Sequence, residues 1–169
     1  MKNKSFKFLL IFLFAGLFAV NSNAQPINIG GGLVLGTSRP NIGLKIQGTY
    51  GMDFLLQNLR TSADLTLFIP GTSNNIHYSR VDFDFDGQYS FYKVSGFDFY
   101  AIGGLNITYY RTKWNVSGNT ITSEVKPGLN VGAGAMYNIS DKMKAFSEFK
   151  YILGRYDQAD ISLGVFFEL

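Results

Sequence analysis

The chain has 169 residues, no cysteine, and 15 basic against 12 acidic side chains, a formal net charge of +3 at pH 7. Three of the basic residues, Lys2, Lys4 and Lys7, lie at the extreme N-terminus, and the rest of the chain carries 12 groups of each sign. The composition therefore excludes a nucleic-acid-binding protein, because no basic surplus remains after the first few residues. It also excludes a fold that depends on disulfides.

The N-terminus has the layout of a secretory signal peptide. A basic head (residues 1–7) precedes an apolar run (8–20), and a short polar stretch then ends at the small residue Ala24. This order predicts export and cleavage after Ala24, and the apolar run is shorter than the roughly 20 residues of a spanning helix. A retained N-terminal anchor is the alternative. We expect a signal peptide over 1–24 and one domain over 25–169.

The rest of the chain divides into segments of about ten residues with period-two alternation, separated by turn-forming clusters, which is the pattern of β-strands. The predicted strands span residues 27–36, 43–54, 60–69, 79–92, 98–110, 125–137, 143–153 and 160–169. Short links (55–58, 93–97, 138–142) alternate with a second set (37–42, 70–78, 111–124, 154–159) that includes two long polar loops. Short turns at one end and long loops at the other are typical of transmembrane β-barrels.

The alternation gives the predicted strands an apolar and a polar face. In chain order, Leu44 and Ile46 oppose Lys45 and Gln47, Ala63 and Leu65 oppose Ser62 and Asp64, Phe83 and Phe85 oppose Asp82 and Asp84, Leu105 and Ile107 oppose Asn106 and Thr108, Leu129 and Val131 oppose Asn130, Phe149 and Tyr151 oppose Glu148 and Lys150, and Ile161 and Leu163 oppose Asp160 and Ser162. Nearly every strand charge therefore falls on one face.

The position of these charges decides the fold class. Inside a soluble sandwich or lipocalin, isolated buried charges would cost about several kcal/mol each. In a membrane barrel the apolar face contacts lipid, and the charges fill the lumen, where they can pair. No stretch after the leader approaches the length of a spanning helix, so a membrane protein here must be a barrel. The sequence predicts an all-β fold, an eight-stranded antiparallel up-and-down transmembrane β-barrel after a cleaved signal peptide.

The segment RVDFDFDGQYSFY (80–92) contains D-x-D-x-D-G, the start of an EF-hand calcium loop. The twelfth position counted from Asp82 must supply a bidentate carboxylate in an EF-hand, and here it is Lys93. In a strand the three aspartates share one face, spaced about 7 Å apart. We interpret them as lumen acids facing lumen bases such as Arg60, Lys126 and Lys150, and expect no metal site and no cofactor. The predicted lumen charge network comprises Arg60, Asp64, Arg80, Asp82, Asp84, Asp86, Lys126, Glu148 and Lys150.

The signal peptide, the eight alternating segments and the closing ISLGVFFEL resemble the small outer-membrane β-barrel proteins of the OmpA/OmpX type, often called the porin family, over residues 25–169. In that family the alternating residues of the last strand form a signal for the outer-membrane assembly machinery. The matching residues here are Leu163, Val165, Phe167 and Leu169, although the usual last residue is Phe.

The resemblance implies a monomer in the outer membrane of a Gram-negative cell envelope. The even number of predicted strands places both termini at the short-turn end, which we expect to face the periplasm. The resemblance also implies contact with outer-membrane lipid and lipopolysaccharide, and no nucleic-acid partner. We expect no periplasmic domain after the predicted barrel, so the peptidoglycan-binding part of the family's role is not carried over.

We favour a structural or surface-interaction role for this barrel and expect no enzymatic activity. Eight strands leave an interior that side chains can fill, so we expect charged and aromatic side chains to plug the lumen. An open diffusion pore needs about sixteen strands. The glycines of 30–32, 103–104 and 132–134 lack phosphate-loop spacing, and we interpret them as relieving crowding in a tight barrel.

Two alternatives stay open. A barrel could bind a small ligand or a protein through the loop over 111–124, where Arg111, Lys113 and Trp114 form a candidate contact patch. The same Trp could instead belong to an aromatic girdle at the membrane interface. The less favoured alternative is a lipid A-modifying hydrolase that uses His77 and Ser79, because an H-x-S arrangement resembles that of lipid A deacylases. Such a pair would need an orienting acid, for which Glu124 or Asp157 is the candidate.

Overall fold

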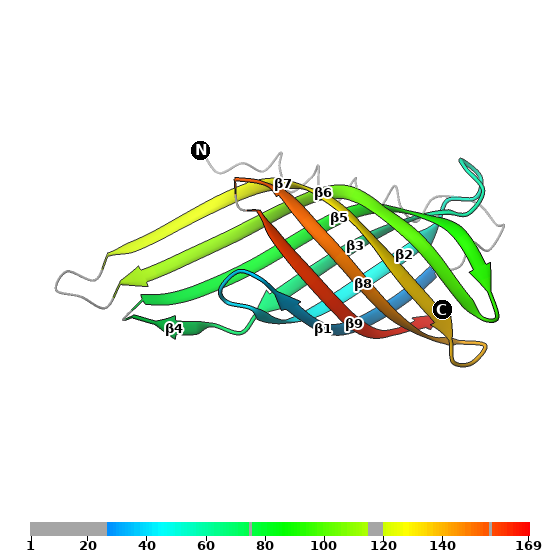
Figure 1. The fold of residues 1–169 in the computed structure, drawn as a ribbon, viewed down its shortest axis with the longest axis horizontal. Helices are drawn as coiled ribbons and strands as arrows, with labels where there is room; N and C mark the ends of the chain where they lie inside the picture. The colour runs from blue at the N-terminus through cyan, green and yellow to red at the C-terminus, as the bar shows by residue number, and fades with distance from the viewer. Residues whose placement is uncertain (1–26, 75, 115–119, 156) are drawn as a thin grey trace, which may run out of the picture.

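A computed structural model describes residues 27–74, 76–114, 120–155 and 157–169, and the predicted signal peptide lies outside them. In this part of the chain the strands are β1 (Ile27–Gly36), β2 (Ile42–Gly51), β3 (Leu59–Phe68), β4 (Gly71–Ser73), β5 (Ile76–Val94), β6 (Phe97–Trp114), β7 (Ile121–Asn138), β8 (Met143–Gly154) and β9 (Gln158–Glu168). All except β4 form the wall of a closed antiparallel barrel (Figure 1). Among the described residues, no helix is long and apolar enough to cross a membrane.

The barrel has up-and-down topology. Each wall strand pairs with the next wall strand along the chain. Strand β3 pairs directly with β5, because β4, which lies between them in the sequence, is not part of the wall. The sheet closes where β1 pairs with β9, from Asn28↔Glu168 to Gly36↔Asp160. Eight strands therefore make the wall. The predicted all-β class, strand number and antiparallel order are confirmed.

The ends of the strands differ most from the prediction around the two long links. Strands β5, β6 and β7 are 19, 18 and 18 residues long, so much of the predicted loops 70–78 and 111–124 is strand. Thr112 pairs with Thr122, and Ile76 with Trp114, beyond the predicted strand ends. These extensions carry polar residues on both faces, so they lack the two-faced alternation by which the other strands were recognised. Their β-branched and aromatic residues nevertheless favour strand structure.

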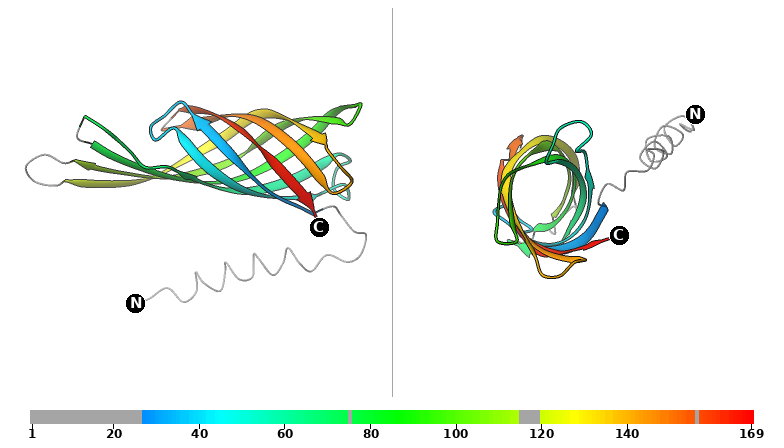
Figure 2. Two further views of the ribbon diagram at one scale, coloured as in Figure 1. Left: turned by 90° about the horizontal axis from the view of Figure 1, so that it is seen from below. Right: turned by 90° about the vertical axis from the view of Figure 1, so that its right-hand side faces the viewer.

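The two ends of the barrel are unlike, as predicted. Short turns at 52–58, 95–96 and 139–142 lie at one end together with Ile27 and Leu169, and we call this the short-turn end (Figure 2). At the other end, here called the loop end, β4 and the extensions of β5, β6 and β7 project beyond the wall (Figure 2). The tightest turn has Ser95 at φ 47° and Gly96 at φ 84°. Positive φ at both central residues is the type I′ geometry that matches strand twist.

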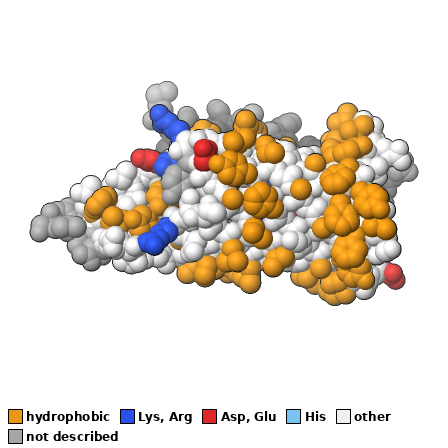
Figure 3. All heavy atoms as spheres, in the orientation of Figure 1, with side chains coloured by type: hydrophobic (Ala, Val, Ile, Leu, Met, Phe, Trp, Pro, Cys, Tyr) orange, Lys and Arg blue, Asp and Glu red, His pale blue; other side chains and the backbone are white. Residues whose placement is uncertain are grey.

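The sorting of side chains between the two faces follows the prediction. Phe83, Phe85 and Leu163 are 50%, 50% and 57% exposed on the outer wall, whereas Asp82 and Asp84 are 1% and 3% exposed in the lumen. Hydrophobic side chains are spread over the barrel wall in Figure 3, with the charged groups of this face gathered mainly towards the loop end. The C-terminal row lies on the outer wall as well: Leu163, Val165, Phe167 and Leu169 are all exposed. The wall therefore presents apolar surface outwards.

Part of the interior is apolar. Tyr100, Ile102, Met136, Phe146 and Phe166 form a buried cluster, and the last two rings are 4.5 Å apart between centroids. Glycines make room for these rings. A Cβ at Gly134 would lie 2.4 Å from the Tyr100 ring, and one at Gly164 only 2.6 Å from Phe146 and 2.2 Å from the carbonyl oxygen of Gly31. These contacts support the interpretation that glycines relieve crowding in this barrel, but not at Gly103, where a Cβ would meet nothing within 4 Å.

Gly164→Ala is expected to lower the free energy of unfolding by about 1–3 kcal/mol, because the new methyl group overpacks the interior against a backbone oxygen that cannot rotate away. Urea-induced unfolding in lipid vesicles measures the change. Gly103→Ala is the matched control, since a Cβ there would meet nothing within 4 Å. Equal effects of the two substitutions would contradict tight packing around Gly164.

Candidate functional site

The centre of the lumen is an ion-pair cluster built from three strands. Asp64 of β3 lies directly opposite Asp84 of β5 in the sheet register, and Asp86 is the next inward residue of β5. Lys150 reaches them from β8: its Nζ is 3.1 Å from Asp64 and 3.2 Å from Asp86, and it also contacts Asp84. Each of these side chains is at most 4% exposed. Like charges placed opposite each other repel. The Lys150 ammonium group offsets this repulsion and stabilises the carboxylate cluster.

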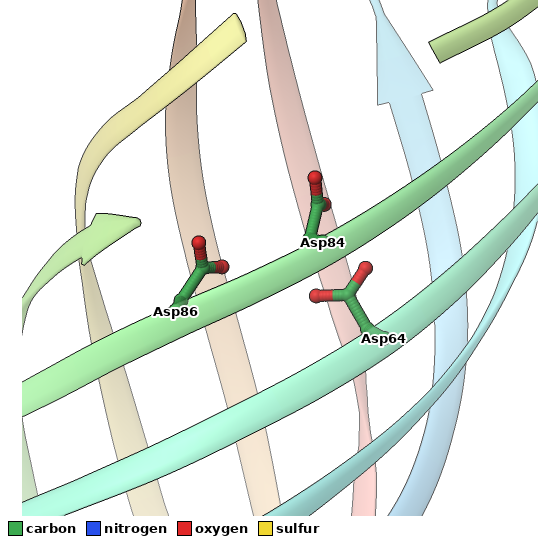
Figure 4. A group of neighbouring side chains, drawn as sticks. All are labelled: Asp64, Asp84 and Asp86. Atoms are coloured by element: carbon green, nitrogen blue, oxygen red, sulfur yellow. The ribbon is translucent and has the colours of Figure 1, made fainter. Parts of the chain in front are cut away.

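The same three carboxylates are the donor set that a hard cation would use. Ligand oxygens of Asp64, Asp84 and Asp86 lie within 4.8 Å of one another, and Figure 4 shows them close together on neighbouring strands. Oxygen donors of this kind suit Ca²⁺. Here, however, the Lys150 ammonium already contacts all three. The chain supplies its own cation, and the arrangement is an internal salt-bridge cluster.

A second group of contacts surrounds Glu148 of β8. Lys45 Nζ lies 3.1 Å from this carboxylate and 3.5 Å from Asp64, so it links the two groups. Gln47 and Gln88 donate to Glu148 at 3.2 and 3.1 Å, and the Tyr100 hydroxyl donates at 3.0 Å. Glu148 is 2% exposed. A buried carboxylate is tolerated when charge and hydrogen bonds are both supplied, and here β2, β5 and β6 supply them.

A third group lies nearer the loop end. The Arg80 guanidinium donates to Asp82 on its own strand and to Asp160 of β9 at 2.8 Å. Its Cζ also lies 3.8 Å from the centre of the Phe68 ring, a cation–π contact. Arg80 is 1% exposed. The three groups together place paired charges along the lumen, on the loop-end side of the apolar cluster.

Two residues of the predicted network lie in other pairs. Arg60 bonds to Asp98 at 2.8 Å near the short-turn end, because it is level with Gln88 rather than with the aspartates of β5. Lys126 lies 3.0 Å from Glu124 on the part of β7 beyond its last pair with β8, Gly128↔Gly154. The expected pairing of these two bases with Asp82, Asp84 and Asp86 is therefore corrected.

Sequence reasoning did not assign a role to the lumen amides. Asn106 donates to Asp84 at 2.6 Å and Asn130 donates to Asp86 at 2.7 Å, while Gln47 and Gln88 donate to Glu148. All four amides are 1–2% exposed. Each amide occupies a polar position in the alternation of its strand, so the sequence did indicate that it faces the lumen. Alternation does not reveal which carboxylate an amide reaches.

The candidate contact residues lie on strand rather than loop. Arg111, Lys113 and Trp114 close β6, and Trp114 is 46% exposed. Lys113 pairs in register with His77 and Ile121, and Arg111 with Ser79 and Ser123. The projecting sheet therefore fixes the backbone positions of these residues relative to the neighbouring strands.

The geometry around His77 and Ser79 does not support the hydrolase alternative. His77 and Ser79 lie on β5 in the projecting sheet, and His77 Nδ1 lies 3.1 Å from the Thr72 hydroxyl. Of the two candidate orienting acids, Glu124 pairs with Lys126 and Asp157 accepts from the backbone N–H of Gly154 at 2.9 Å. In a catalytic triad the nucleophile hydrogen-bonds to the base, and the base hydrogen-bonds to the orienting acid. Here both candidate acids bond to other groups.

A closed antiparallel sheet with paired charges inside and an apolar wall outside defines a transmembrane β-barrel of the outer-membrane type. Each wall strand pairs with a neighbour on both sides, so the wall has no open edge, and lipid can cover the outer face. No family model and no curated protein matches the chain. Solved structures do match it, and several of them are small outer-membrane barrels.

Neisserial surface protein A is 14% identical, covers 89% of this chain and 100% of its own, and has a TM-score of 0.67. The N-terminal barrel domain of Pseudomonas aeruginosa OprF is 17% identical over 85% of this chain and 97% of its own, at 0.63. The Yersinia pestis attachment invasion locus protein Ail, solved with the heparin analogue sucrose octasulfate, is 14% identical over 86% and 97%, at 0.61. At such identities these matches show the fold, and the resemblance drawn from the sequence is confirmed at that level.

Proposed function

We propose that the protein is an integral outer-membrane protein whose filled barrel is a structural scaffold for the projecting sheet at the cell surface, with the short-turn end and both termini in the periplasm. The observation that carries this proposal is the inverted sorting of side chains, with phenylalanine and leucine on the outer wall and paired aspartate, glutamate, lysine and arginine within. Such a wall would be insoluble in water and matches the hydrocarbon core of a bilayer.

Cell fractionation and gel mobility test this proposal together. The protein should sediment with the outer membrane and resist cold detergent, with a mobility shift only after boiling, because a closed barrel keeps its hydrogen-bonded wall until heat disrupts it. Recovery from the soluble periplasm would contradict it.

The closed lumen is part of the same proposal. Side chains of the Lys150, Glu148 and Arg80 groups fill successive levels of the barrel, and an eight-stranded wall leaves little space beyond them. Planar-bilayer recordings of the purified protein should accordingly show no steady conductance. Stable single-channel steps would contradict a plugged lumen.

A surface-binding role is the second candidate, and the loop-end charges favour it. Exposed Arg39, Arg111 and Arg155 and half-buried Lys113 lie at this end. Positive groups where the wall meets the outer leaflet suit phosphate and sulfate groups, so we propose the anionic headgroups of lipopolysaccharide as a ligand. The complex of Ail with a sulfated sugar illustrates anion binding by a protein of the same fold.

Reversing two of these charges tests the second candidate. Arg111→Glu with Lys113→Glu should weaken binding to lipopolysaccharide-containing vesicles by about tenfold or more at low salt, and the difference should shrink as salt screens the charges. Binding is measured by flotation of the refolded protein. Lys142→Glu, at the short-turn end, is the control and should have no effect; equal loss in both variants would contradict a specific loop-end contact.

A further inference from the structure

The turn between β2 and β3 carries three consecutive apolar residues on its surface. Phe54, Leu55 and Leu56, here called the apolar triplet, are 63%, 68% and 51% exposed. The other turns at the short-turn end have the sequences SG (95–96) and ISDK (139–142), which are mostly polar. Single exposed apolar residues are ordinary on a protein surface, whereas a contiguous group indicates an interaction surface. The apolar triplet is such a group.

Hydrogen bonds within the turn hold the apolar triplet in place. The backbone N–H groups of Leu55 and Leu56 both donate to the carbonyl of Met52, at 2.9 and 3.1 Å. The Asp53 carboxylate accepts from the backbone N–H of Asn58 at 2.7 Å. These bonds close the turn on itself, so its backbone is satisfied internally without drawing the apolar side chains into the barrel.

The polar and apolar residues of this turn lie on different sides. The lumen opens at the short-turn end into a cavity of about 490 Å³, and Asp53 and Asn58 lie in its wall. The apolar triplet is not among the described residues that line this cavity. In the view along the barrel, the turn stands out beyond the outline of the wall (Figure 2, right). The triplet therefore projects sideways, away from the lumen.

The turn is level with aromatic rings of the outer wall. The Asn58 carbonyl accepts from the backbone N–H of Ser90 at 3.0 Å, so the turn lies beside the last residues of β5. Two residues further along β5, the ring of Tyr92 lies 6.1 Å from that of Phe99, between centroids. Hydrophobic side chains gather at this end of the wall in Figure 3. Aromatic girdles of transmembrane barrels lie at the level of the lipid headgroups, so the apolar triplet lies near that level.

We propose that the apolar triplet inserts sideways into the lipid leaflet at the short-turn end and anchors this rim of the barrel there. Lipid is the partner, because the triplet continues the apolar wall at the level of its aromatic rings and projects from it. Interfacial anchors bury their apolar residues about 5–10 Å into the boundary between headgroups and acyl chains. This inference rests on the membrane location proposed above, and the test below distinguishes failure of the anchor from failure of that location.

Spin labels test the anchor, because the chain has no cysteine and a single introduced cysteine is labelled alone. Leu55→Cys places a label in the apolar triplet, Leu105→Cys on the outer wall, and Lys142→Cys in another turn at the same end. In phosphatidylcholine nanodiscs, the labels at 55 and 105 should collide more with dissolved oxygen than with a water-soluble nickel chelate. The label at 142 should collide more with the nickel chelate, because its turn is polar and meets water.

Two pairs of substitutions in the Leu55→Cys protein test the cause of insertion. Phe54→Ser with Leu56→Ser should shift the turn from lipid towards water by about tenfold or more, because the apolar side chains that favour insertion are gone. Phe54→Leu with Leu56→Met keeps the turn apolar and should leave the label in lipid. Both proteins must keep the heat-modifiable band.

Three results would overturn the anchor while leaving the membrane location intact, provided that the label at 105 stays in lipid. They are nickel access at 55 equal to that at 142, protection of the label at 55 from both reagents, as in a protein contact, and equal effects of the two pairs of substitutions. Nickel access at 105 as well would contradict the membrane location itself, and the anchor with it.

Discussion

Lys150→Met is expected to destabilise the barrel more than any other single substitution in the lumen. The change keeps the length of the side chain but removes the Lys150 ammonium, which contacts Asp64, Asp84 and Asp86 together. Breaking a buried ion pair by removing one partner costs about 3–5 kcal/mol, and here three carboxylates lose their shared counter-charge. The free energy of unfolding, from urea titration in lipid vesicles, should fall by at least that much, or the protein should fail to refold.

Two further variants distinguish electrostatics from lost packing. Lys144→Met removes a lysine from the more exposed pair with Glu168, where the side chains are 20% and 36% exposed, and should cost about 1 kcal/mol or less. Adding Asp64→Asn and Asp84→Asn to Lys150→Met removes the repulsion and should restore much of the lost stability. A Lys150→Met protein as stable as the wild type would contradict the counter-ion role.

Phe85→Arg is expected to have the second-largest effect. Phe85 is 50% exposed on the outer wall, on the same strand as the buried aspartates. An arginine on the lipid face near the bilayer midplane costs about 2–4 kcal/mol, and the cost falls to about 0–1 near the interfaces. Unfolding in vesicles should therefore lose a few kcal/mol for Phe85→Arg.

Ile121→Arg is the matched control for that substitution. Ile121 is also 50% exposed, but it begins β7 in the projecting sheet, beyond the last β7–β8 pair at Gly128↔Gly154. Its side chain should meet water, and the substitution should change stability little. A similar penalty at both positions would mean that the membrane covers the projecting sheet, and no penalty at either would mean that no lipid contacts the wall.

The architecture was predictable because one face of each strand had to be apolar. Phe83 and Phe85 alternate with Asp82 and Asp84, and a register slip by one residue would place the charges in lipid. Alternation, together with the turn-forming clusters between the segments, therefore predicted the existence and number of the wall strands. The same argument fails for the projecting strands. Around Thr112 and Thr122 both faces meet water, so neither the strand ends nor β4 could be recognised from alternation.

The contacts within the lumen were less predictable than its composition. The sequence indicates that Arg60, Arg80, Lys126 and Lys150 share the polar face, but the choice of partner depends on the height of each residue along the tilted strands. Lys150 reaches residues of β3 and β5 from β8 across the lumen, whereas Arg60 is level with Gln88. The alternation along a strand predicts whether a side chain points into the lumen or outwards. Which partner it meets there depends on how the barrel closes and how its strands are staggered.

Methyl NMR of the unmodified protein in nanodiscs tests directly whether the outer wall contacts lipid. Methyl groups of Leu65, Leu105 and Leu163 lie on the exposed face, whereas those of Val34, Ile102 and Ile152 are buried in the lumen, with at most 4% exposure. A lipid carrying a nitroxide in its acyl chain should strongly broaden the three leucine signals and spare the other three. Equal broadening of both sets, or broadening of the lumen set alone, would contradict contact between the outer wall and lipid.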